Sequence, residues 1–150
     1  TLSKKMQCAG LPAHLLGLEC LENEIVTENT EALTNMAELR ELGFRILLDD
    51  FGAGYSNISY LRRMPADIIK LDKSLIGGIT KDSGCRTIAS SIIRMLKDLD
   101  YVVVAEGVED AATMELLIKY GCDEAQGFYF SRPLPPAALE AWLNNNSSRK

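Results

Sequence analysis

The sequence predicts an α/β fold, a partial TIM-like (β/α) barrel with about five βα units. Short runs of branched apolar residues alternate with longer runs of helical periodicity, and this order implies parallel strands joined by helical crossovers. Nearly every predicted strand also ends beside a side chain that can bind metal or phosphate. The strand ends of a parallel barrel gather on one face, where active sites are built, so this pattern favours a barrel.

The first half of the chain is expected to contain two strands and two helices. The mostly apolar run 15–21 predicts a strand. Residues 30–42 predict a helix because their apolar residues recur with helical spacing, and Gly43 is suited to end it. The apolar run 45–48 predicts a second, buried strand. Residues 57–64 predict a short helix that Pro65 ends.

The second half is expected to contain three strands and three helices. The strands are predicted from short apolar or β-branched runs at 67–71, 101–105 and 124–128. The helices are predicted from apolar residues that recur on one face at 86–99, 111–120 and 136–143. Gly121 follows the second of these helices and is suited to end it. The polar residues 143–150 are expected to form a flexible tail.

The alternative to a barrel is a doubly wound sheet. Such a sheet usually carries a glycine-rich phosphate turn after its first strand, and the sequence has none there. No internal sequence repeat, low-complexity segment or interior linker is evident. A complete barrel needs eight βα units and about 250 residues. Residues 1–150 are therefore expected to form a portion of one longer barrel domain.

The amino-acid composition limits the kinds of molecule that the chain is expected to bind. The chain has 16 basic and 21 acidic residues, and its net charge of −5 argues against polymeric nucleic acid as a partner. No apolar run approaches the roughly 20 residues that a membrane span needs, and no signal peptide is evident. The four cysteines lack paired spacing and are expected to be reduced thiols. A cytoplasmic protein is expected, although a longer parent can be membrane-anchored elsewhere.

The segment DDFGAGYSN at residues 49–57 is the most informative motif. Asp49 and Asp50 follow a predicted buried strand, and adjacent carboxylates there repel each other unless a cation lies between them. Gly52 and Gly54 allow a tight turn or a close approach to a ligand. On its own, the acid pair is also compatible with a helix cap. With the other strand-end residues, it predicts the edge of a metal-binding active site.

Four further segments accompany this motif in order: LECLE at 18–22, LRRMPADIIKLDKSLI at 61–76, VVAEGVED at 103–110 and QGFYFSRPLP at 126–135. Each is weak alone, but the five together are highly specific. On these residues, the chain resembles the C-terminal part of the EAL domain, the bacterial phosphodiesterase that opens cyclic di-GMP. The resemblance implies a TIM-like barrel with two metal ions, Mg²⁺ or Mn²⁺, on its C-terminal face.

The resemblance also implies residue roles. Metal ligands would be Glu19, Asp49, Asp50 and Glu106, and Glu106 is alternatively the group that takes a proton from water. Lys70 would hold that water and the phosphate, and Gln126 would support water or substrate. Glu22 and Glu109 would position the loop after Asp50. Substrate contacts are expected from Gly52, Tyr55, Ser56, Asp72, Gln126 and Phe128.

Several of these residues also allow a plainer interpretation. Asp72 is equally suited to cap the helix that follows it, and Tyr55 and Phe128 are equally suited to packing. Lys70 can be a surface lysine whose stem alone is buried. Glu22 can be an ordinary solvated charge.

Departures from the family pattern limit what this chain is expected to do. The Glu-Ala-Leu strand and a later asparagine ligand are absent, so the two-metal site is expected to be incomplete. Leu21 stands where the family usually has Thr, which removes a hydroxyl near Glu19 and Glu22. The alternative to an enzyme is a non-catalytic cyclic di-GMP receptor or protein-interaction module.

The partial barrel has a further implied consequence. Terminal strands of an open sheet invite pairing, and apolar faces are expected to be exposed at 46–48 and 102–104. A homodimer or swapped assembly is therefore expected to cover them.

Overall fold

One sheet of five parallel strands forms the centre of the computed structural model, which describes residues 2–22, 30–54 and 58–146. The strands are β1 (Gly17–Leu21), β2 (Arg45–Phe51), β3 (Ile68–Leu71), β4 (Val102–Ala105) and β5 (Glu124–Ala125). Each pairs with its neighbour in chain order. A doubly wound sheet changes direction around its first strand, so this sequential order is that of a barrel. Within the described residues, the sheet remains an open arc from β1 to β5.

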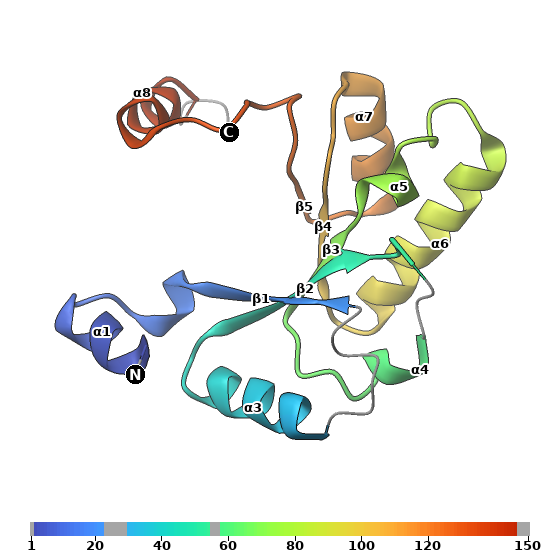
Figure 1. Cartoon of the computed structure of the whole chain (residues 1–150). Coiled ribbons are helices and arrows are strands. Elements are labelled where there is room, and N and C mark those ends of the chain that lie inside the picture. Colours follow the sequence, from blue (N-terminus) through green and yellow to red (C-terminus); the bar gives the residue numbers. More distant parts are fainter. Residues whose placement is uncertain (1, 23–29, 55–57, 147–150) are drawn as a thin grey trace.

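Five helices among the described residues cover one face of the sheet (Figure 1). They are α3 (Thr30–Glu41), α4 (Ile58–Leu61), α5 (Lys73–Ile76), α6 (Ser83–Asp98) and α7 (Ala111–Tyr120). Towards the chain ends lie α1 (Leu2–Cys8), the short 3-10 helix η1 (Ala13–Leu15) and α8 (Pro136–Asn146), and neither α1 nor α8 has a buried residue. No helix among the described residues is both long and apolar enough to cross a bilayer.

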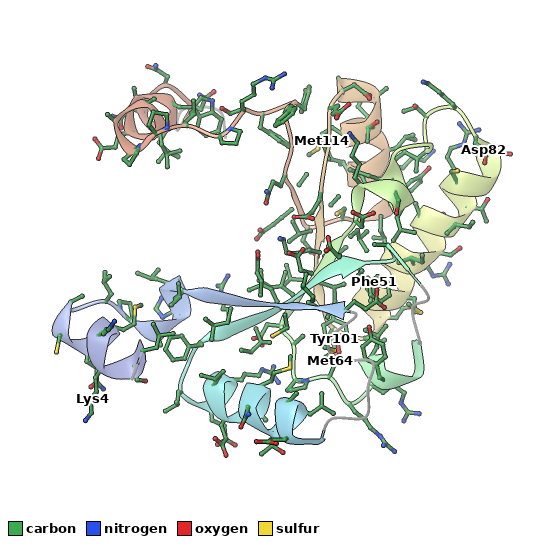
Figure 2. The ribbon with its side chains drawn as sticks, in the orientation of Figure 1. Lys4, Phe51, Met64, Asp82, Tyr101 and Met114 are labelled. Atoms are coloured by element: carbon green, nitrogen blue, oxygen red, sulfur yellow. The ribbon has the colours of Figure 1, made fainter. Side chains whose placement is uncertain are left out.

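The two faces of the sheet have different chemistry. Alternate strand residues on the helix side are fully buried and belong to the hydrophobic core; examples are Ile46 and Leu48 on β2, Ile69 and Leu71 on β3, and Val103 on β4. Phe51, Met64 and Tyr101, labelled in Figure 2, join the same core. The alternate residues face the other side, and among them are the charged side chains of the site. The helix-facing core therefore fixes which side each charged residue takes.

Aspartate caps begin three of the helices. Asp72, Asp82 and Asp110 accept hydrogen bonds from the N–H groups of Ser74, Cys85 and Thr113, at the starts of α5, α6 and α7. Such caps satisfy backbone donors that the first helical turn leaves free. The Asp82 cap explains why α6 begins at Ser83, three residues earlier than predicted.

Some predicted boundaries were wrong. β2 continues through Phe51, so the acid pair lies inside the strand. α4 is only four residues long, β5 only two, and α8 continues to Asn146. The expected exposed apolar faces at 46–48 and 102–104 are also wrong, because the neighbouring strands and helices bury most of these residues. The exposed large apolar side chains lie elsewhere, among them Leu15, Leu42, Ile118 and Phe128.

A buried tyrosine ties α4 to the sheet, and it yields a stability prediction. The Tyr101 hydroxyl donates to the backbone oxygens of Leu61, at 2.6 Å, and Met64, at 3.3 Å. We expect Tyr101→Phe to lower the free energy of unfolding by about 1 kcal/mol, because a buried hydrogen bond is lost. Urea unfolding measures this, with Tyr129→Phe at an exposed position as the control. Equal stability of the two variants would contradict the assignment.

Candidate active site and metal centre

An irregularity at the end of β2 brings two carboxylates together. The pairing of β2 with β3 shifts register between Leu48 and Phe51, and Asp50 has a φ of 57°. Successive side chains of a regular strand point to opposite faces, whereas a bulge redirects a side chain. The Asp50 N–H donates to Oδ1 of Asp49 over 3.0 Å. This local distortion allows adjacent acids to serve one site.

One ammonium group joins carboxylates from three other strands. Nζ of Lys70, on β3, lies 2.8 Å from Oε1 of Glu19, 3.0 Å from Oδ1 of Asp49 and 2.8 Å from Oε1 of Glu106. Glu19 belongs to β1, Asp49 to β2, and Glu106 directly follows β4. The Lys70 side chain is 9% exposed. Residues from four neighbouring strands therefore meet at one buried cation.

The surroundings of Lys70 favour its charged form. Burial alone would lower the pKa of Lys70, but hydrogen bonds to Glu106, Glu19 and Asp49 outweigh it and raise that pKa above its usual value. The stabilisation is fully present at neutral pH and is lost only as pH rises through the raised pKa. Lys70 is therefore a hydrogen-bond donor and a fixed positive charge at neutral pH, and it is not a base.

Three carboxylates of this cluster have the spacing of a cation site. One oxygen each from Asp49, Asp50 and Glu106 lies within 4.8 Å of the others, and all three residues are half-buried. Carboxylate oxygens are the donors that Mg²⁺ and Mn²⁺ prefer. Glu19, Asp49 and Glu106 contact one ammonium and Asp50 adds a fourth carboxylate to the cluster, so negative charge remains uncompensated. The donor set fits a hard divalent cation.

Glu22 anchors the loop that follows the acid pair. Its Oε2 accepts from the Gly52 N–H at 3.1 Å, and its Oε1 accepts from the Tyr60 hydroxyl at 2.9 Å. Glu22 is 3% exposed, so both oxygens accept these hydrogen bonds in a buried environment. Burial and the nearby Glu22 carboxylate raise the pKa of Tyr60, which keeps its hydroxyl protonated as a donor. The loop start is thus held to the end of β1 and to α4.

The short helix α5 packs against the starts of two loops. Gly52 has a φ of 91°, which favours glycine, and a Cβ there would lie 2.2 Å from Cδ1 of Leu75 in α5 and would force that side chain to move. Lys73, in the same helix, forms an ion pair with Glu109. Glu109 was predicted to hold the loop after Asp50, but it lies against α5, which in turn contacts that loop. Asp72 caps this helix, as its plainer interpretation predicted.

The remaining predicted residues lie towards the C-terminal end of the sheet. Gln126 donates its backbone N–H to the Ala105 oxygen at 2.8 Å, which places it beside Glu106 on the neighbouring strand end; its side chain is exposed. Phe128 is 55% exposed, and the Arg132 guanidinium lies 4.5 Å from its ring centre. Tyr55 and Ser56 lie outside the described residues.

Sequence reasoning missed three residues of this region: Tyr60, Lys73 and Arg132. Tyr60 lies in a short helical run, where a tyrosine ordinarily indicates packing. Lys73 and Arg132 are single basic residues whose partners are far away along the chain. Only the loop packing and strand register reveal their contacts.

Known proteins resemble this chain in sequence and in fold. Cyclic di-GMP phosphodiesterase NbdA of Pseudomonas aeruginosa is 43% identical over 138 residues, which are 92% of this chain and 18% of that protein. The structure of the PaMucR phosphodiesterase in complex with c-di-GMP matches with a TM-score of 0.83 and 35% identity, over 91% of this chain and 55% of that one. Klebsiella pneumoniae BlrP1, solved with manganese and cyclic di-GMP, matches with a TM-score of 0.81 and 37% identity, over 88% of this chain and 34% of that one.

The match to a whole family agrees with these individual likenesses. The chain spans about a fifth of the length of NbdA, so it corresponds to one part of a larger relative. A sequence model described as the EAL domain matches residues 1–133. Since this match covers most of the chain, the protein belongs to the EAL domain family.

Proposed function

We propose that the domain to which this chain belongs hydrolyses cyclic di-GMP to linear pGpG in the bacterial cytoplasm, with Mg²⁺ or Mn²⁺ as cofactor. The observation that carries the proposal is the junction of Lys70 with Glu19, Asp49 and Glu106 at the C-terminal strand ends. Such a junction suits an anionic phosphodiester, because it offers a fixed cation beside acids able to hold metal. The named activity of NbdA and the c-di-GMP bound to PaMucR support the same substrate.

Each part of the cluster has a role in this proposal. Asp49, Asp50 and Glu106 would hold a divalent cation, with Glu19 as a further ligand. When bound, such a cation supplies Lewis acidity to phosphoryl oxygens and activates water. Lys70 would donate hydrogen bonds to the phosphate and the attacking water. Glu106 is the alternative acceptor for that water's proton, and Gln126 would orient water or substrate.

Substrate contacts follow from the elements around the cluster. Gly52, Tyr55 and Ser56 follow the acid pair in sequence, and Asp72 and Phe128 come after β3 and β5. The exposed Phe128 ring offers a flat surface for a guanine base. Glu22 would act on substrate only through the loop that it holds.

Turnover is the direct test of the proposal. We expect a protein extended to the complete EAL domain to convert cyclic di-GMP to pGpG with Mn²⁺, and chelation to abolish turnover. Glu106→Gln should lower kcat at least 100-fold, because a metal ligand or proton acceptor is lost. Glu115→Gln, on the exposed side of α7, is the control.

We expect the 150-residue chain alone to show little or no turnover. Tight binding without turnover by the complete domain would favour the receptor alternative.

Metal binding can be tested on the chain itself. Lys70→Met should lower stability by about 3 kcal/mol without metal, because it leaves Asp49 and Glu106 without their cation. Mn²⁺ should then raise the melting temperature of this variant more than that of the wild type, since the metal replaces the missing charge. Thermal unfolding with and without Mn²⁺ measures the effect, and Lys73→Met serves as the control. Equal Mn²⁺ responses of Lys70→Met and Lys73→Met would count against a cation site.

We also propose a homodimer or swapped assembly that covers the open edges. Leu21, on the edge strand β1, is 42% exposed, and Phe128 and Tyr129, after the edge strand β5, are 55% and 45% exposed. Light scattering at micromolar concentration should give twice the chain mass. Tyr129→Ser should weaken the assembly, whereas Ile118→Ser, on exposed α7, should not. A stable wild-type monomer would refute this proposal.

A further inference from the structure

An aspartate at the start of β3 forms two hydrogen bonds with the preceding strand. The backbone N–H of Asp67 donates to the Ile46 oxygen at 2.9 Å, and its Oδ2 accepts from the Ile46 N–H at 3.0 Å. Its Oδ1 lies 2.7 Å from Nε of Arg40, on α3. One residue therefore joins β3, β2 and the helix that leads into β2. We call this set of contacts the Asp67 clamp.

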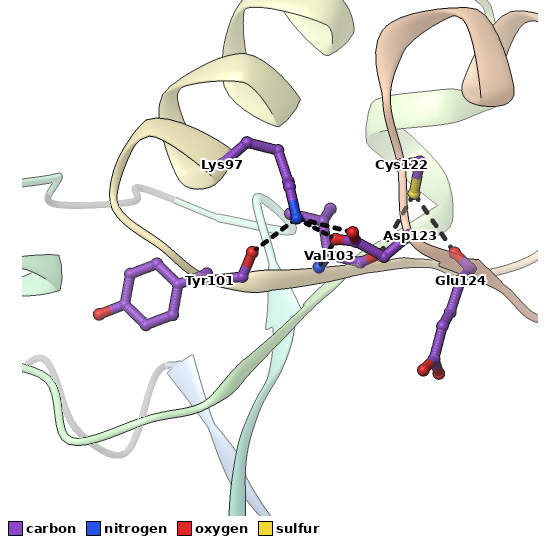
Figure 3. A network of polar contacts seen from close by, with 6 residues as sticks. All are labelled: Lys97, Tyr101, Val103, Cys122, Asp123 and Glu124. Carbon is purple, nitrogen blue, oxygen red and sulfur yellow. Dashed lines mark hydrogen bonds and ion pairs between the residues drawn. The ribbon is translucent and has the colours of Figure 1, made fainter.

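The same set of contacts recurs at the start of β5 (Figure 3). The backbone N–H of Asp123 donates to the Val103 oxygen at 3.1 Å, and its Oδ2 accepts from the Val103 N–H at 2.8 Å. Nζ of Lys97, on α6, lies 2.6 Å from Oδ1 and 2.7 Å from Oδ2, and it also donates to the Tyr101 oxygen at 3.3 Å. This Asp123 clamp joins β5, β4 and the helix that leads into β4.

The segments that lead into β2 and β4 also correspond. Gly43 and Asp100, just after the helices, both have positive φ, at 88° and 64°. The next residues, Phe44 and Tyr101, are both buried aromatics, and each donates its N–H to a leucine oxygen in the last turn of its helix. From Arg40 to Ile46 and from Lys97 to Val103, corresponding residues keep the same separation along the chain.

The correspondence continues to the strand ends. Asp50 and Gly107 both have positive φ, at 57° and 68°. The residues before them, Asp49 and Glu106, both pair with Lys70.

We infer that α3-β2-α4-β3 and α6-β4-α7-β5 are two copies of one structural unit, in which Asp67 and Asp123 are positioning residues for the site at the opposite strand ends. In each copy, an acid lies three residues beyond the strand residue that the aspartate binds: Asp49 after Ile46, and Glu106 after Val103. A polar residue likewise lies three residues beyond the aspartate: Lys70 after Asp67, and Gln126 after Asp123.

This spacing gives the clamps a structural consequence. Three residues of strand span about 10 Å. Each clamp fixes the register of two strands at one end. It thereby determines which side chains lie beside each other at the other end. Slippage by one residue would turn a side chain to the opposite face.

A simple ion pair would not have this effect. The Asp67 and Asp123 side chains are 28% and 31% exposed, so their ion pairs alone add little stability. The distinctive part is the carboxylate oxygen that accepts from a strand N–H, since it depends on the alignment of both strands. The basic partner orients this carboxylate from the helix.

Hydrogen exchange on the 150-residue chain tests the inference without substrate or metal, and so independently of the proposed phosphodiesterase activity. Asp123→Ala should lower the protection of the Gln126 and Val108 amides, at the site end, at least tenfold more than that of amides in α6. Asp82→Ala removes the carboxylate that caps α6 at the opposite end from Lys97, and should spare both site-end amides. A uniform loss of protection in Asp123→Ala would overturn the positioning role.

Two milder changes keep the test informative if Asp123→Ala does not fold. Asp123→Asn retains an oxygen for the Val103 N–H and should keep Gln126 protection within threefold of wild type. Lys97→Arg should also leave Gln126 protection within threefold of wild type, because an arginine, Arg40, pairs with the corresponding aspartate in the other copy. Loss of site-end protection in both variants would overturn the inference.

Charge exchange separates the clamp from an ion pair. The double variant Lys97→Asp/Asp123→Lys keeps opposite charges but leaves no acceptor for the Val103 N–H at position 123. We expect it to lose Gln126 protection like Asp123→Ala. Restoration of wild-type protection would show that an ion pair alone suffices and would overturn the positioning role.

Discussion

The ammonium group of Lys70 is the contact on which the arrangement of the site depends. Carboxylates from neighbouring strands repel one another, and here three of them share one nearly buried cation. Every strand from β1 to β4 contributes to this junction. The strands must therefore be correctly aligned for the charged side chains of the cluster to meet. Hydrogen bonds that outweigh burial keep the lysine charged. A metal ion would therefore enter a cluster that is already partly neutralised.

The rest of the molecule serves this junction from a distance. The helix-side core, with Ile69 and Leu71 on β3, directs Lys70 to the opposite face. The bulge at Asp50 adds a second carboxylate where a regular strand would offer one. At the other end of the sheet, Asp67 and Asp123 fix pairs of strands against each other. Packing thus sets the face on which Lys70 lies, the bulge adds a carboxylate to the cluster, and register aligns the strands that carry it.

The sequence alone predicted the elements that have strong local signals. Helical periodicity located α3, α6 and α7, and the β-branched run Val102–Ala105 located β4. The sequence also named Lys70, Glu19, Asp49 and Glu106, because acids and a lysine at strand ends are visible in a linear pattern. It missed the bulge, since nothing in Leu48–Phe51 fixes register, and it indicated α5 only through the possible Asp72 cap, since four residues are too few for periodicity. The repeat escaped because its equivalent residues are seldom identical; Arg40 and Lys97 share charge, whereas Gly43 and Asp100 share only backbone conformation.

The sequential order of the strands also bears on how the chain folds. Each strand lies beside the one that precedes it, so every pairing closes a short segment, and local closure favours rapid folding. Glu19 and Asp49 are synthesised before Lys70, and Glu106 comes after it. As β3 docks, the lysine meets two acids whose strands already exist, and its charge is in place before the last acid arrives. Docking of β3 therefore supplies the opposing charge for the acids of β1 and β2 before Glu106 is added.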